Sequence, residues 1–500
     1  PYPPLGTLYA ASVMREAGYR VALFDAMLAE GTHEWEAALD QHTPRYAVIY
    51  EDNFNYLSKM SLLRMREAAM TMIRAAKARG CVVIVCGSDA SDHPDAYLRA
   101  GADVAILGEG DAALPEVVGI LNEHDVGARR ALPDDAQEIT ARARHALPLQ
   151  SLPGIAGIAY LDAAGAVVRT MARPVIGDLD SLPFPAWDLV DREKYARIWR
   201  EHHGYYSMNL VTTRGCPFHC NWCAKPIWGQ RYNVRSAENV VAEMKWLKEN
   251  FAPDHIWFMD DIMGIQDRWI ERFADLLDEQ NVRIPFKSLN RVDLLLRGRT
   301  IPALARAGAQ IVWVGAESGS QKILDAMEKG TRVEQIYEAT RQLHAHGVKV
   351  AFFLQFGYPG ETREDIELTL KMVRDLLPDD IGISVSYPLP GTKFYEQVKH
   401  ELGERVNWID SADLAMLYQG PFGTPFYRQL HTVVHKEYRA RKTAAALRAA
   451  LRDPRRLRPG LIRQTAAAVY HTLTIGRARA ELDRLAGRAW LSIPFANEFS

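Results

Sequence analysis

One stretch decides how this chain is interpreted: Cys216-Pro217-Phe218-His219-Cys220-Asn221-Trp222-Cys223. Its three cysteines have the spacing C-x3-C-x2-C. Thiolates are the soft ligands that hold iron–sulfur clusters. A four-iron cluster needs four ligands, so Cys216, Cys220 and Cys223 would leave one iron open to a small molecule. Buried structural cysteines are one alternative, and a zinc site is another, although zinc would require a fourth ligand at regular spacing.

The composition is that of an ordinary soluble protein. The 500 residues suffice for two or three domains. The formal net charge of −2 implies no general attraction to nucleic acid or to a membrane surface. Five cysteines, three of them in one motif, do not form a disulfide framework, which favours a reduced, cytoplasmic setting. We find no signal peptide and no apolar stretch long enough to span a membrane. The chain begins at Pro1 rather than at Met, which suggests a trimmed N-terminus.

The first part of the chain alternates between helical and strand-like segments. A helical pattern over 5–17 ends at Gly18. Strands are expected at 19–24, 46–50, 81–86 and 104–107, and buried strands separated by helices predict a parallel, doubly wound sheet. Such sheets bind ligands at the carboxyl ends of their strands. The loops at those ends are Glu51-Asp52-Asn53-Phe54, Gly87-Ser88-Asp89 and Gly108-Glu109-Gly110, and their glycines let a large flat ligand approach the backbone.

A connecting segment and a second set of strands follow. Residues 155–160 and 166–171, around Asp162-Ala163-Ala164-Gly165, have the pattern of a β-hairpin. Six further strands are expected, and each leads into a polar loop. Their ranges are 210–213, 255–259, 286–289, 311–314, 348–356 and 381–386.

The cysteine motif, with Trp222 before its last cysteine and Gly215 and Pro217 around its first, resembles that of the radical S-adenosylmethionine (SAM) enzymes. The six strands fit the partial (β/α)6 barrel, of TIM type, of that family, in which active residues lie at the carboxyl ends of the strands. Pro3-Pro4-Leu5-Gly6, Gly87-Ser88 and Gly108-Glu109-Gly110 are similar to segments of the cobalamin-binding domain that is fused to many of these enzymes. The resemblance covers about residues 1–400.

The resemblance implies an α/β fold with four parts. We expect a Rossmann-like, doubly wound cobalamin-binding domain in 1–125 and a linker with a β-hairpin in 126–192. The radical SAM partial barrel is expected in 193–400, and a mainly helical, substrate-capping region in 401–500. In the family a strand precedes the Pro-Pro-Leu-Gly segment, and that strand is missing from this sequence.

The family resemblance also implies which residues bind SAM. Asp260 and Asp261 stand where the family receives the SAM amino group, with a solvated helix cap as the alternative. Arg291 is expected to pair the SAM carboxylate, with a surface salt bridge as the alternative. The segment 315–319 has the family pattern Gly-x-Glu-Ser-Gly, in which Glu317 accepts hydrogen bonds from SAM. The catalytic residues are thus the three cysteines and Glu317. The expected SAM-binding set is Trp222, Asp260, Asp261, Ser288, Arg291, Gly315, Glu317, Ser318, Gln355 and Tyr387.

Cobalamin contacts are implied in the same way for the N-terminal loops. The expected set is Pro4, Leu5, Gly6, Glu51, Asp52, Asn53, Phe54, Gly87, Ser88, Gly108, Glu109 and Gly110. Many cobalamin proteins supply a histidine to cobalt from an Asp-x-His-x-x-Gly motif, which this sequence lacks. Met27 stands at the place of the histidine, and Asp92-His93 lacks the spacing. We therefore expect no histidine below cobalt and place the loop 51–54 beneath the corrin. A Rossmann-like domain that binds nothing is the alternative.

The cofactors implied by the resemblance are a [4Fe-4S] cluster, SAM and cobalamin. An external electron donor such as flavodoxin or ferredoxin reduces the cluster, and SAM is cleaved to a 5′-deoxyadenosyl radical that takes hydrogen from an unactivated carbon. Methyl transfer from methylcobalamin is the expected outcome because it is the commoner one in the family. Two alternatives stay open: an oxidative cyclase like that of anaerobic bacteriochlorophyll synthesis, and a cluster-bearing sensor without radical chemistry. The substrate is expected to be a small molecule, and no nucleic-acid partner is expected.

The C-terminal region is basic. Between Arg428 and Arg463 there are eleven Lys or Arg residues against two acids, Glu437 and Asp453. Such a tail can contact anionic lipid at a membrane surface or an acidic partner, and a solvated helical face is the alternative. The aromatic-rich stretch 408–426 is expected to cap the barrel as a substrate wall, which is compatible with a large hydrophobic substrate such as a porphyrin or a polycyclic lipid.

Overall fold

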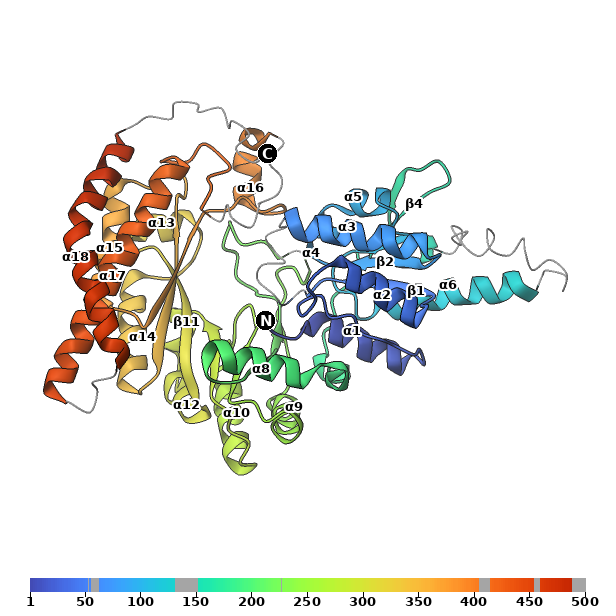
Figure 1. The fold of residues 1–500 in the computed structure, drawn as a ribbon, viewed down its shortest axis with the longest axis horizontal. Helices are drawn as coiled ribbons and strands as arrows, with labels where there is room; N and C mark the ends of the chain where they lie inside the picture. The colour runs from blue at the N-terminus through green and yellow to red at the C-terminus, as the bar shows by residue number, and fades with distance from the viewer. Residues whose placement is uncertain are drawn as a thin grey trace.

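The computed structural model describes residues 1–52, 54, 63–130, 152–225, 227–403, 414–453 and 459–487. Figure 1 shows an N-terminal sheet with helices on both faces, a larger curved sheet, and a pair of long helices on the outer side of that second sheet. The fold is therefore α/β with a mainly helical C-terminal extension, as the sequence predicts.

The N-terminal sheet has the strand order β1-β2-β3-β4-β5. Its first three strands are parallel, and one apolar cluster packs on each of its faces. The strands are β1 (Tyr46–Tyr50), β2 (Val82–Cys86), β3 (Val104–Ile106), β4 (Ile158–Leu161) and β5 (Val167–Arg169). The helices are α1 (Leu5–Glu16), α2 (Thr32–His42), α3 (Leu63–Ala78), α4 (Ser88–Asp92), α5 (Pro94–Arg99) and α6 (Ala113–Arg130).

The strand expected at 19–24 does not form, and this prediction was wrong. The segment belongs to no sheet, although Tyr19 and Val21 pack against the apolar cluster that includes Tyr50 of β1. In doubly wound sheets of order 2-1-3-4-5, the first strand lies between the second and the third. The described residues include no strand before α1, so the backbone of 19–24 has no neighbouring strand with which to exchange hydrogen bonds.

The expected β-hairpin is present as β4 and β5, and it extends the N-terminal sheet. Asp162 turns the chain, because its carboxylate accepts hydrogen bonds from the backbone N–H groups of Ala164 and Ala166. Strand β4 pairs antiparallel with β3, so the hairpin lies at the edge of that sheet.

The second sheet contains the six parallel strands that the sequence predicts, in the order β6-β9-β10-β11-β12-β13. They are β6 (Ser207–Leu210), β9 (His255–Phe258), β10 (Phe286–Asn290), β11 (Ala309–Glu317), β12 (Lys349–Phe356) and β13 (Asp380–Val385). The first of them ends earlier than expected, because Thr213 and Arg214 form β7 and pair with β8 (Asn233–Val234) instead. The principal helices of this part are α8 (Arg192–His203), α9 (Ala237–Asn250), α10 (Asp267–Glu279), α12 (Thr300–Ala307), α14 (Val333–Ala345) and α15 (Arg363–Leu376). Short helices are α11 (Val292–Leu295), α13 (Gln321–Ala326) and α16 (Lys393–Leu402), with single turns at Leu152–Gly154, Leu179–Ser181 and Trp187–Leu189.

Side-chain alternation gives this sheet two different faces. Phe258 and Phe286 contact Phe273 of α10, so they lie on the convex, helix-covered face. Their neighbours Trp257 and Lys287 consequently lie on the concave face, which is turned toward the N-terminal part of the chain (Figure 1). In barrels of this type the active residues lie at the carboxyl ends of the strands.

The C-terminal extension is a helical hairpin of α17 (Thr424–Arg452) and α18 (Pro459–Ala486). Lys436 donates to Thr474, and Tyr438 donates to the backbone of Pro378, which fixes α17 between α18 and the barrel. No described helix combines the length and the hydropathy that crossing a membrane requires. Of the aromatic stretch 408–426, Trp408 lies outside the described residues, whereas Tyr418 donates to the backbone of Gly357 just beyond β12.

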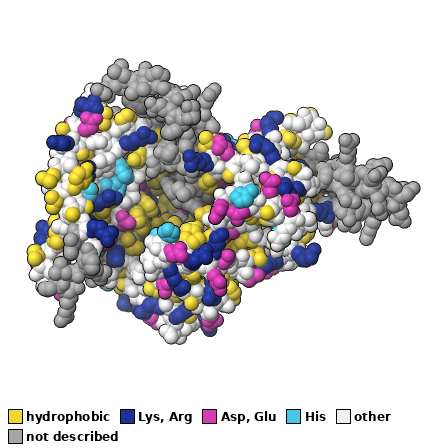
Figure 2. Space-filling model, viewed as in Figure 1, with side chains coloured by type: hydrophobic (Ala, Val, Ile, Leu, Met, Phe, Trp, Pro, Cys, Tyr) yellow, Lys and Arg dark blue, Asp and Glu magenta, His cyan; other side chains and the backbone are white. Residues whose placement is uncertain are grey.

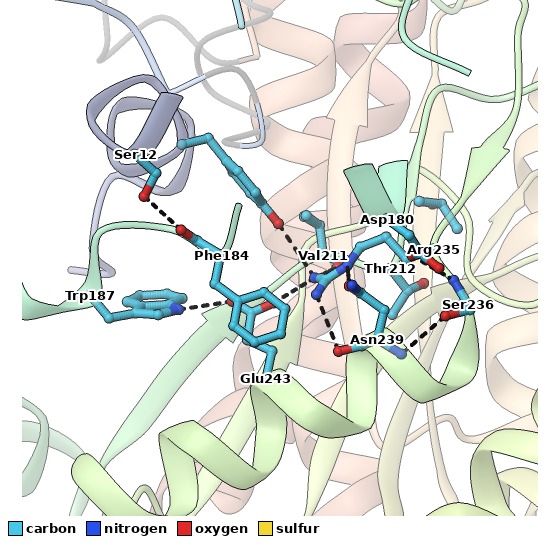
Figure 3. Close-up of polar contacts among 12 residues, drawn as sticks. Ser12, Asp180, Phe184, Trp187, Val211, Thr212, Arg235, Ser236, Asn239 and Glu243 are labelled. Carbon is cyan, nitrogen blue, oxygen red and sulfur yellow. Dashed lines mark hydrogen bonds and ion pairs between the residues drawn. The ribbon is translucent and has the colours of Figure 1, made fainter. Parts of the chain in front are cut away.

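A buried ion pair joins the N-terminal part to the barrel (Figure 3). Arg235 follows β8, and its guanidinium lies 2.6 Å from the Glu243 carboxylate and donates to the Val211 carbonyl. The other oxygen of Glu243 accepts from the Trp187 indole at 2.8 Å. Ser12 of α1 donates to the carbonyl of Phe184, whose ring lies 5.7 Å from Arg235. Helix α1, the segment 180–187 and the start of β7 are thus connected through one buried charge pair.

Replacing Glu243 should destabilise the protein strongly. Glu243→Ala would leave Arg235 buried without its counter-charge, at a cost of about 3–5 kcal/mol in the free energy of unfolding. Urea denaturation followed by circular dichroism measures this. The control is Glu238→Ala on the same helix, whose exposed pair with Arg272 should contribute about 0–1 kcal/mol. Equal effects of the two substitutions on the free energy of unfolding would contradict the stabilising role of the Arg235–Glu243 pair.

Candidate functional site

The cysteine loop is held closed at its base. Strands β7 and β8 pair antiparallel on either side of it, so its two ends lie together. Gly215 has φ +80°, and a Cβ there would lie 2.4 Å from the carbonyl oxygen of Arg231, so only glycine fits. Asn221, in the middle of the loop, donates to the backbone of Ala326 and accepts from the Tyr358 hydroxyl. These contacts fix the loop against the carboxyl ends of the barrel strands.

The three cysteines are partly exposed thiols with no disulfide among them. Among the described residues no group of His, Cys, Asp and Glu converges as the ligands of a single metal ion do. A four-iron cluster makes a different demand, because each thiolate binds a different iron. Burial raises the pKa of the Cys216 thiol, and Lys225 opposes that rise. Positive charge beside the loop favours the thiolate form, and the donor set therefore fits an iron–sulfur cluster.

Arg291 supplies part of that positive charge. It follows β10, and its guanidinium lies 3.8 Å from the sulfur of Cys220 and 3.7 Å from the ring centroid of Phe218. The same guanidinium donates to the carbonyl of Lys329 at 2.8 Å and pairs with Asp293. The predicted site residue Arg291 is therefore a neighbour of the cysteine loop and not a surface salt bridge.

Glu317 pairs with a lysine that the sequence did not single out. Lys329 is buried, and its ammonium lies 2.8 Å from Glu317 and 5.9 Å from the ring centroid of Trp222. Burial lowers the pKa of Lys329, but the charge of Glu317, the charge of Cys220 and the hydrogen bond to Glu317 together outweigh burial, and the pKa is raised. A Cβ on Gly315 would lie 2.5 Å from both charged groups, so glycine leaves the room for this pair. Glu317 itself has φ +56°, a strained value for a non-glycine residue that is typical of functional sites.

Two of the expected SAM residues are occupied by protein contacts. Both oxygens of Asp260 accept hydrogen bonds from the backbone and hydroxyl of Thr212 and the backbone of Thr213, at 2.6–2.9 Å. Burial raises the pKa of Asp260 to about 6. Ser318 is fully buried against Thr369. Asp260 thus ties the end of β9 to the start of β7 and is neither the solvated cap nor an open carboxylate, whereas Asp261 is partly exposed.

Two further members of the set carry buried polar atoms that form no hydrogen bond within the part of the chain that the structure describes. These are the side-chain oxygen of Gln355 and the indole N–H of Trp222. Buried polar groups are nearly always paired, so each is a position at which a ligand could complete a hydrogen bond. Ser288 donates to Asn290, and Tyr387 is buried. The structure therefore brings Cys220, Trp222, Arg291 and Glu317 together around Lys329.

The loops of the N-terminal sheet also meet at one edge. Asp52 accepts from the backbone N–H groups of Gly6 and Phe54, and burial raises its pKa to about 6. Burial, together with the charge of Asp89, raises the pKa of Glu51 to about 8. The hydroxyl of Ser88, next to Gly87, is buried and has no hydrogen-bond partner among the described residues. Asn53 lies outside the described residues. The side chain of Leu5 lies in the core, beside the buried Pro4, so it is not free to contact a ligand.

The loop 108–110 also takes part in a buried ion pair with the barrel. The carboxylate of Glu109 lies 2.5 Å from the guanidinium of Arg214, and Asp111 lies 2.8 Å from the same group. The rings of Tyr9 and Phe54 lie over this guanidinium, with their centroids at 5.1 and 5.5 Å. Because Arg214 precedes Gly215 and Cys216, this contact joins the N-terminal sheet directly to the cysteine loop. Gly108 stays partly exposed, whereas Gly110 is buried, with Cys86 and Tyr50 at 2.7 and 2.8 Å from the position of a Cβ, so of the two glycines only Gly108 is open to the predicted contact with cobalamin.

Comparisons with known proteins agree with this geometry. Residues 210–373 match the model of the Radical SAM superfamily. An uncharacterized methyltransferase of Pyrococcus horikoshii is 25% identical over 412 residues, which cover 81% of each chain. The anaerobic magnesium-protoporphyrin IX monomethyl ester cyclase of Rubrivivax gelatinosus is 30% identical over 51% of this chain and 44% of its own length.

Among solved structures, the cobalamin-dependent S-adenosylmethionine radical enzyme OxsB with aqua-cobalamin and S-adenosylmethionine bound superposes with a TM-score of 0.68. The match covers 96% of this chain and 70% of OxsB at 17% sequence identity, which establishes a shared fold. The chain therefore contains a radical SAM domain, set in the fold of a cobalamin-dependent radical SAM enzyme.

Proposed function

We propose that this protein is a cobalamin-dependent radical SAM enzyme that transfers a methyl group to an unactivated carbon of a small molecule. The observation that carries the proposal is the continuous set of contacts from Cys220 through Arg291 and Lys329 to Glu317. It places a cation and an anion of the protein beside the cysteine motif, at the carboxyl ends of the barrel strands. The methyltransferase of P. horikoshii, which matches the chain over most of its length, supports methyl transfer as the outcome.

The residues fit the three cofactors. When bound, the cluster and SAM supply a 5′-deoxyadenosyl radical, and cobalamin supplies the methyl group. Cys216, Cys220 and Cys223 would hold the cluster, and Arg291 offsets negative charge at Cys220. Glu317 and Lys329 offer a carboxylate and an ammonium to the zwitterionic amino-acid part of SAM. The unpaired oxygen of Gln355 and indole N–H of Trp222 would complete the set.

The N-terminal loops would hold cobalamin between the two sheets. Glycines 87, 108 and 110 and the buried hydroxyl of Ser88 lie at the carboxyl ends of β2 and β3. The loop 51–54 contains no histidine, so this loop would offer no imidazole to cobalamin. The ion pair between Glu109 and Arg214 fixes the spacing between the carboxyl edge of the N-terminal sheet and the cysteine loop.

The second candidate function is an oxidative cyclisation without methyl transfer. The 30% identity with the cyclase of R. gelatinosus over about half of the chain favours it specifically. Both reactions would require reduction by an external electron donor, for which we propose a flavodoxin or a ferredoxin.

The two functions differ in their products. Anaerobic incubation of the reconstituted holoenzyme with SAM, a strong reductant and a cell extract as substrate source should give 5′-deoxyadenosine and S-adenosylhomocysteine, both measured by mass spectrometry. Cys216→Ala should abolish 5′-deoxyadenosine because it removes a cluster ligand. 5′-Deoxyadenosine without S-adenosylhomocysteine would favour the cyclase, and neither product from cluster-loaded protein would refute the radical enzyme.

The buried pair of Glu317 and Lys329 should be required for SAM binding. Glu317→Gln and Lys329→Met should each lower the affinity for SAM by about tenfold or more, because each leaves a buried charge unpaired and removes a ligand contact. Equilibrium dialysis with SAM measures this, with the iron content of each variant determined alongside. The control is Lys393→Gln, which removes the exposed pair with Glu328 next to Lys329. Unchanged SAM affinity in both variants would exclude the pair from the SAM site.

We also propose that the α17–α18 hairpin contacts an anionic membrane surface. Leu451 and Leu473 are 84% and 76% exposed, and Val469 and Tyr470 are exposed as well. Arg448, Arg452, Arg463 and Arg477 are exposed on the same two helices. Hydrophobic side chains are visible along this outer edge in Figure 2. Apolar side chains with arginines around them suit the interface of an acidic bilayer.

Vesicle sedimentation tests this contact. The holoenzyme should sediment with vesicles that contain phosphatidylglycerol and not with pure phosphatidylcholine vesicles, and Leu451→Ser with Leu473→Ser should reduce binding about tenfold. Leu368→Ser, at an exposed position on α15, serves as the control. Equal sedimentation of all variants would assign the arginines and leucines to a solvated face.

A further inference from the structure

The concave face of the barrel sheet carries partly exposed aromatic side chains. Phe353 of β12 is 40% exposed, and Trp257 of β9 and Trp313 of β11 are partly exposed. The rings of Trp313 and Phe353 lie 4.6 Å apart between centroids. Gly382 of β13 lies opposite Phe353, where a Cβ would contact both rings at 3.3–3.4 Å. In Figure 2, hydrophobic side chains line the hollow between the barrel and the N-terminal part of the chain.

A single lysine lies at one end of this aromatic surface. The ammonium of Lys287, on β10, lies 4.0 Å from the ring centroid of Trp257 and 5.6 Å from that of Tyr2. None of the carboxylates in the described part of the chain forms an ion pair with it. The buried cations Arg214, Arg235 and Lys329, in contrast, all have acidic partners within 2.9 Å. Within the described residues the charge of Lys287 is met by the rings of Trp257 and Tyr2 and not by a carboxylate, so the ammonium can still pair with the anionic group of a ligand.

We infer that Trp257, Lys287, Trp313 and Phe353, here called the Lys287 slot, bind a flat apolar substrate that carries an acidic group. The assignment of this ligand as the substrate rests on the function proposed above. The rings of the slot would stack on the apolar part, and Lys287 would pair the anionic oxygen. Lysine is a compact point charge, so the slot suits a carboxylate or a phosphate and selects neither.

The register of the strands sets the size and orientation of the ligand. The slot extends over the four strands β9 to β12, which at about 4.8 Å per strand gives a width of about 14 Å. Lys287 is the second residue of β10, whereas Glu317 ends β11 beyond Trp313. The acidic group would therefore lie toward the amino ends of the strands, and the apolar part would extend toward Glu317 and the cysteine loop. A polycyclic acid satisfies both requirements.

The charge of Lys287 gives the slot a pH dependence that supports the assignment. Burial lowers the pKa of Lys287 to about 8. The titratable groups that face it are Tyr2 of the N-terminal segment and His255 of β9. Burial raises the pKa of Tyr2, and burial followed by the charge of Lys287 lowers the pKa of His255 to about 4. Both groups are therefore neutral from pH 7 to pH 9. Lys287 loses its proton over this range, so affinity for an anion should fall as the pH rises.

A matched pair of probes tests the slot without knowledge of the substrate. The probes are 8-anilinonaphthalene-1-sulfonate and N-phenyl-1-naphthylamine, which share a ring system and differ in the sulfonate. Binding to the anaerobic holoenzyme is measured by equilibrium dialysis at pH 7, in the absence of reductant. Lys287→Gln should weaken binding of the sulfonate about tenfold and leave the neutral probe unchanged, because only the charge is removed. Lys287→Arg should bind the sulfonate as tightly as the parent does at pH 7. Its affinity for the sulfonate should not fall between pH 7 and pH 9, because arginine stays protonated over this range. Phe353→Ala should weaken both probes.

Controls separate the slot from the fold and from the proposed reaction. Lys371→Gln, which removes an exposed lysine on α15, should change neither probe, and near-ultraviolet circular dichroism verifies the packing of each variant. The inference is overturned if Lys287→Gln binds both probes as the parent does, or if it weakens both equally. The probe experiment measures binding and no turnover, so its result does not depend on the proposed reaction. If the turnover assay gave no 5′-deoxyadenosine, the proposed function would be refuted, and the probe data would still test the Lys287 slot. A carboxylate and a phosphate monoester of the same ring system are then tested as competitors of the sulfonate probe. Equal competition would show that the slot recognises the negative charge and does not distinguish the two groups.

Discussion

The buried guanidinium of Arg214 is the contact on which the arrangement of the two sheets depends. It lies one residue before the glycine that opens the cysteine loop, and its partners Glu109 and Asp111 follow β3 of the N-terminal sheet. Burying three charged groups costs free energy of solvation, which is recovered only when the geometry is close and the remaining donors are used. Such a contact tolerates little displacement. It therefore fixes the distance and angle between the edge of the N-terminal sheet and the cysteine loop of the barrel. Two cofactors that act on one substrate require that kind of fixed spacing.

The same principle recurs where the barrel supports the site. Arg235 with Glu243 joins α1 and the connecting segment to α9, and Lys329 with Glu317 lies beside Trp222. Asp260 uses hydrogen bonds to Thr212 and Thr213 in place of a counter-charge. Each buried charge in this series has a structural partner within the chain. Lys287 differs from these groups because it lies on the concave face and forms no ion pair with a carboxylate of the described residues, which is the basis for proposing the Lys287 slot.

The sequence predicted the features that depend on local pattern. The six barrel strands, the hairpin at Asp162 and the cysteine motif are all short-range signals, and the strands and the hairpin form as expected. Residues whose role depends on distant partners could not be assigned. Glu109 and Arg214 are 105 residues apart, and nothing near either of them indicates the pair. Lys329 lies between a short helix and a glycine. An exposed lysine fits such a local sequence equally well, so the sequence does not reveal that Lys329 is buried. The segment 19–24 has the composition of a strand but lacks the neighbour that a strand requires, and composition cannot reveal a missing neighbour.

The N-terminal segment determines which side of the barrel is left for a substrate. The hydroxyl of Tyr2 lies 3.1 Å from Ser207, and the carbonyl of Pro3 accepts from Asn209, so residues 2 and 3 cover the concave face of β6. Tyr195 and Trp199 of α8 hold this segment in place through hydrogen bonds to the carbonyls of Tyr2 and Pro1. The covered strands are at one end of the sheet, and the exposed ring of Phe353 is toward the other. The ring of Tyr2 also lies 5.1 Å from that of Trp257, so a ligand of the Lys287 slot would approach over Trp313 and the exposed ring of Phe353. Residues 2 and 3 thus cover the β6 end of the concave face, while Phe353 of β12 stays exposed.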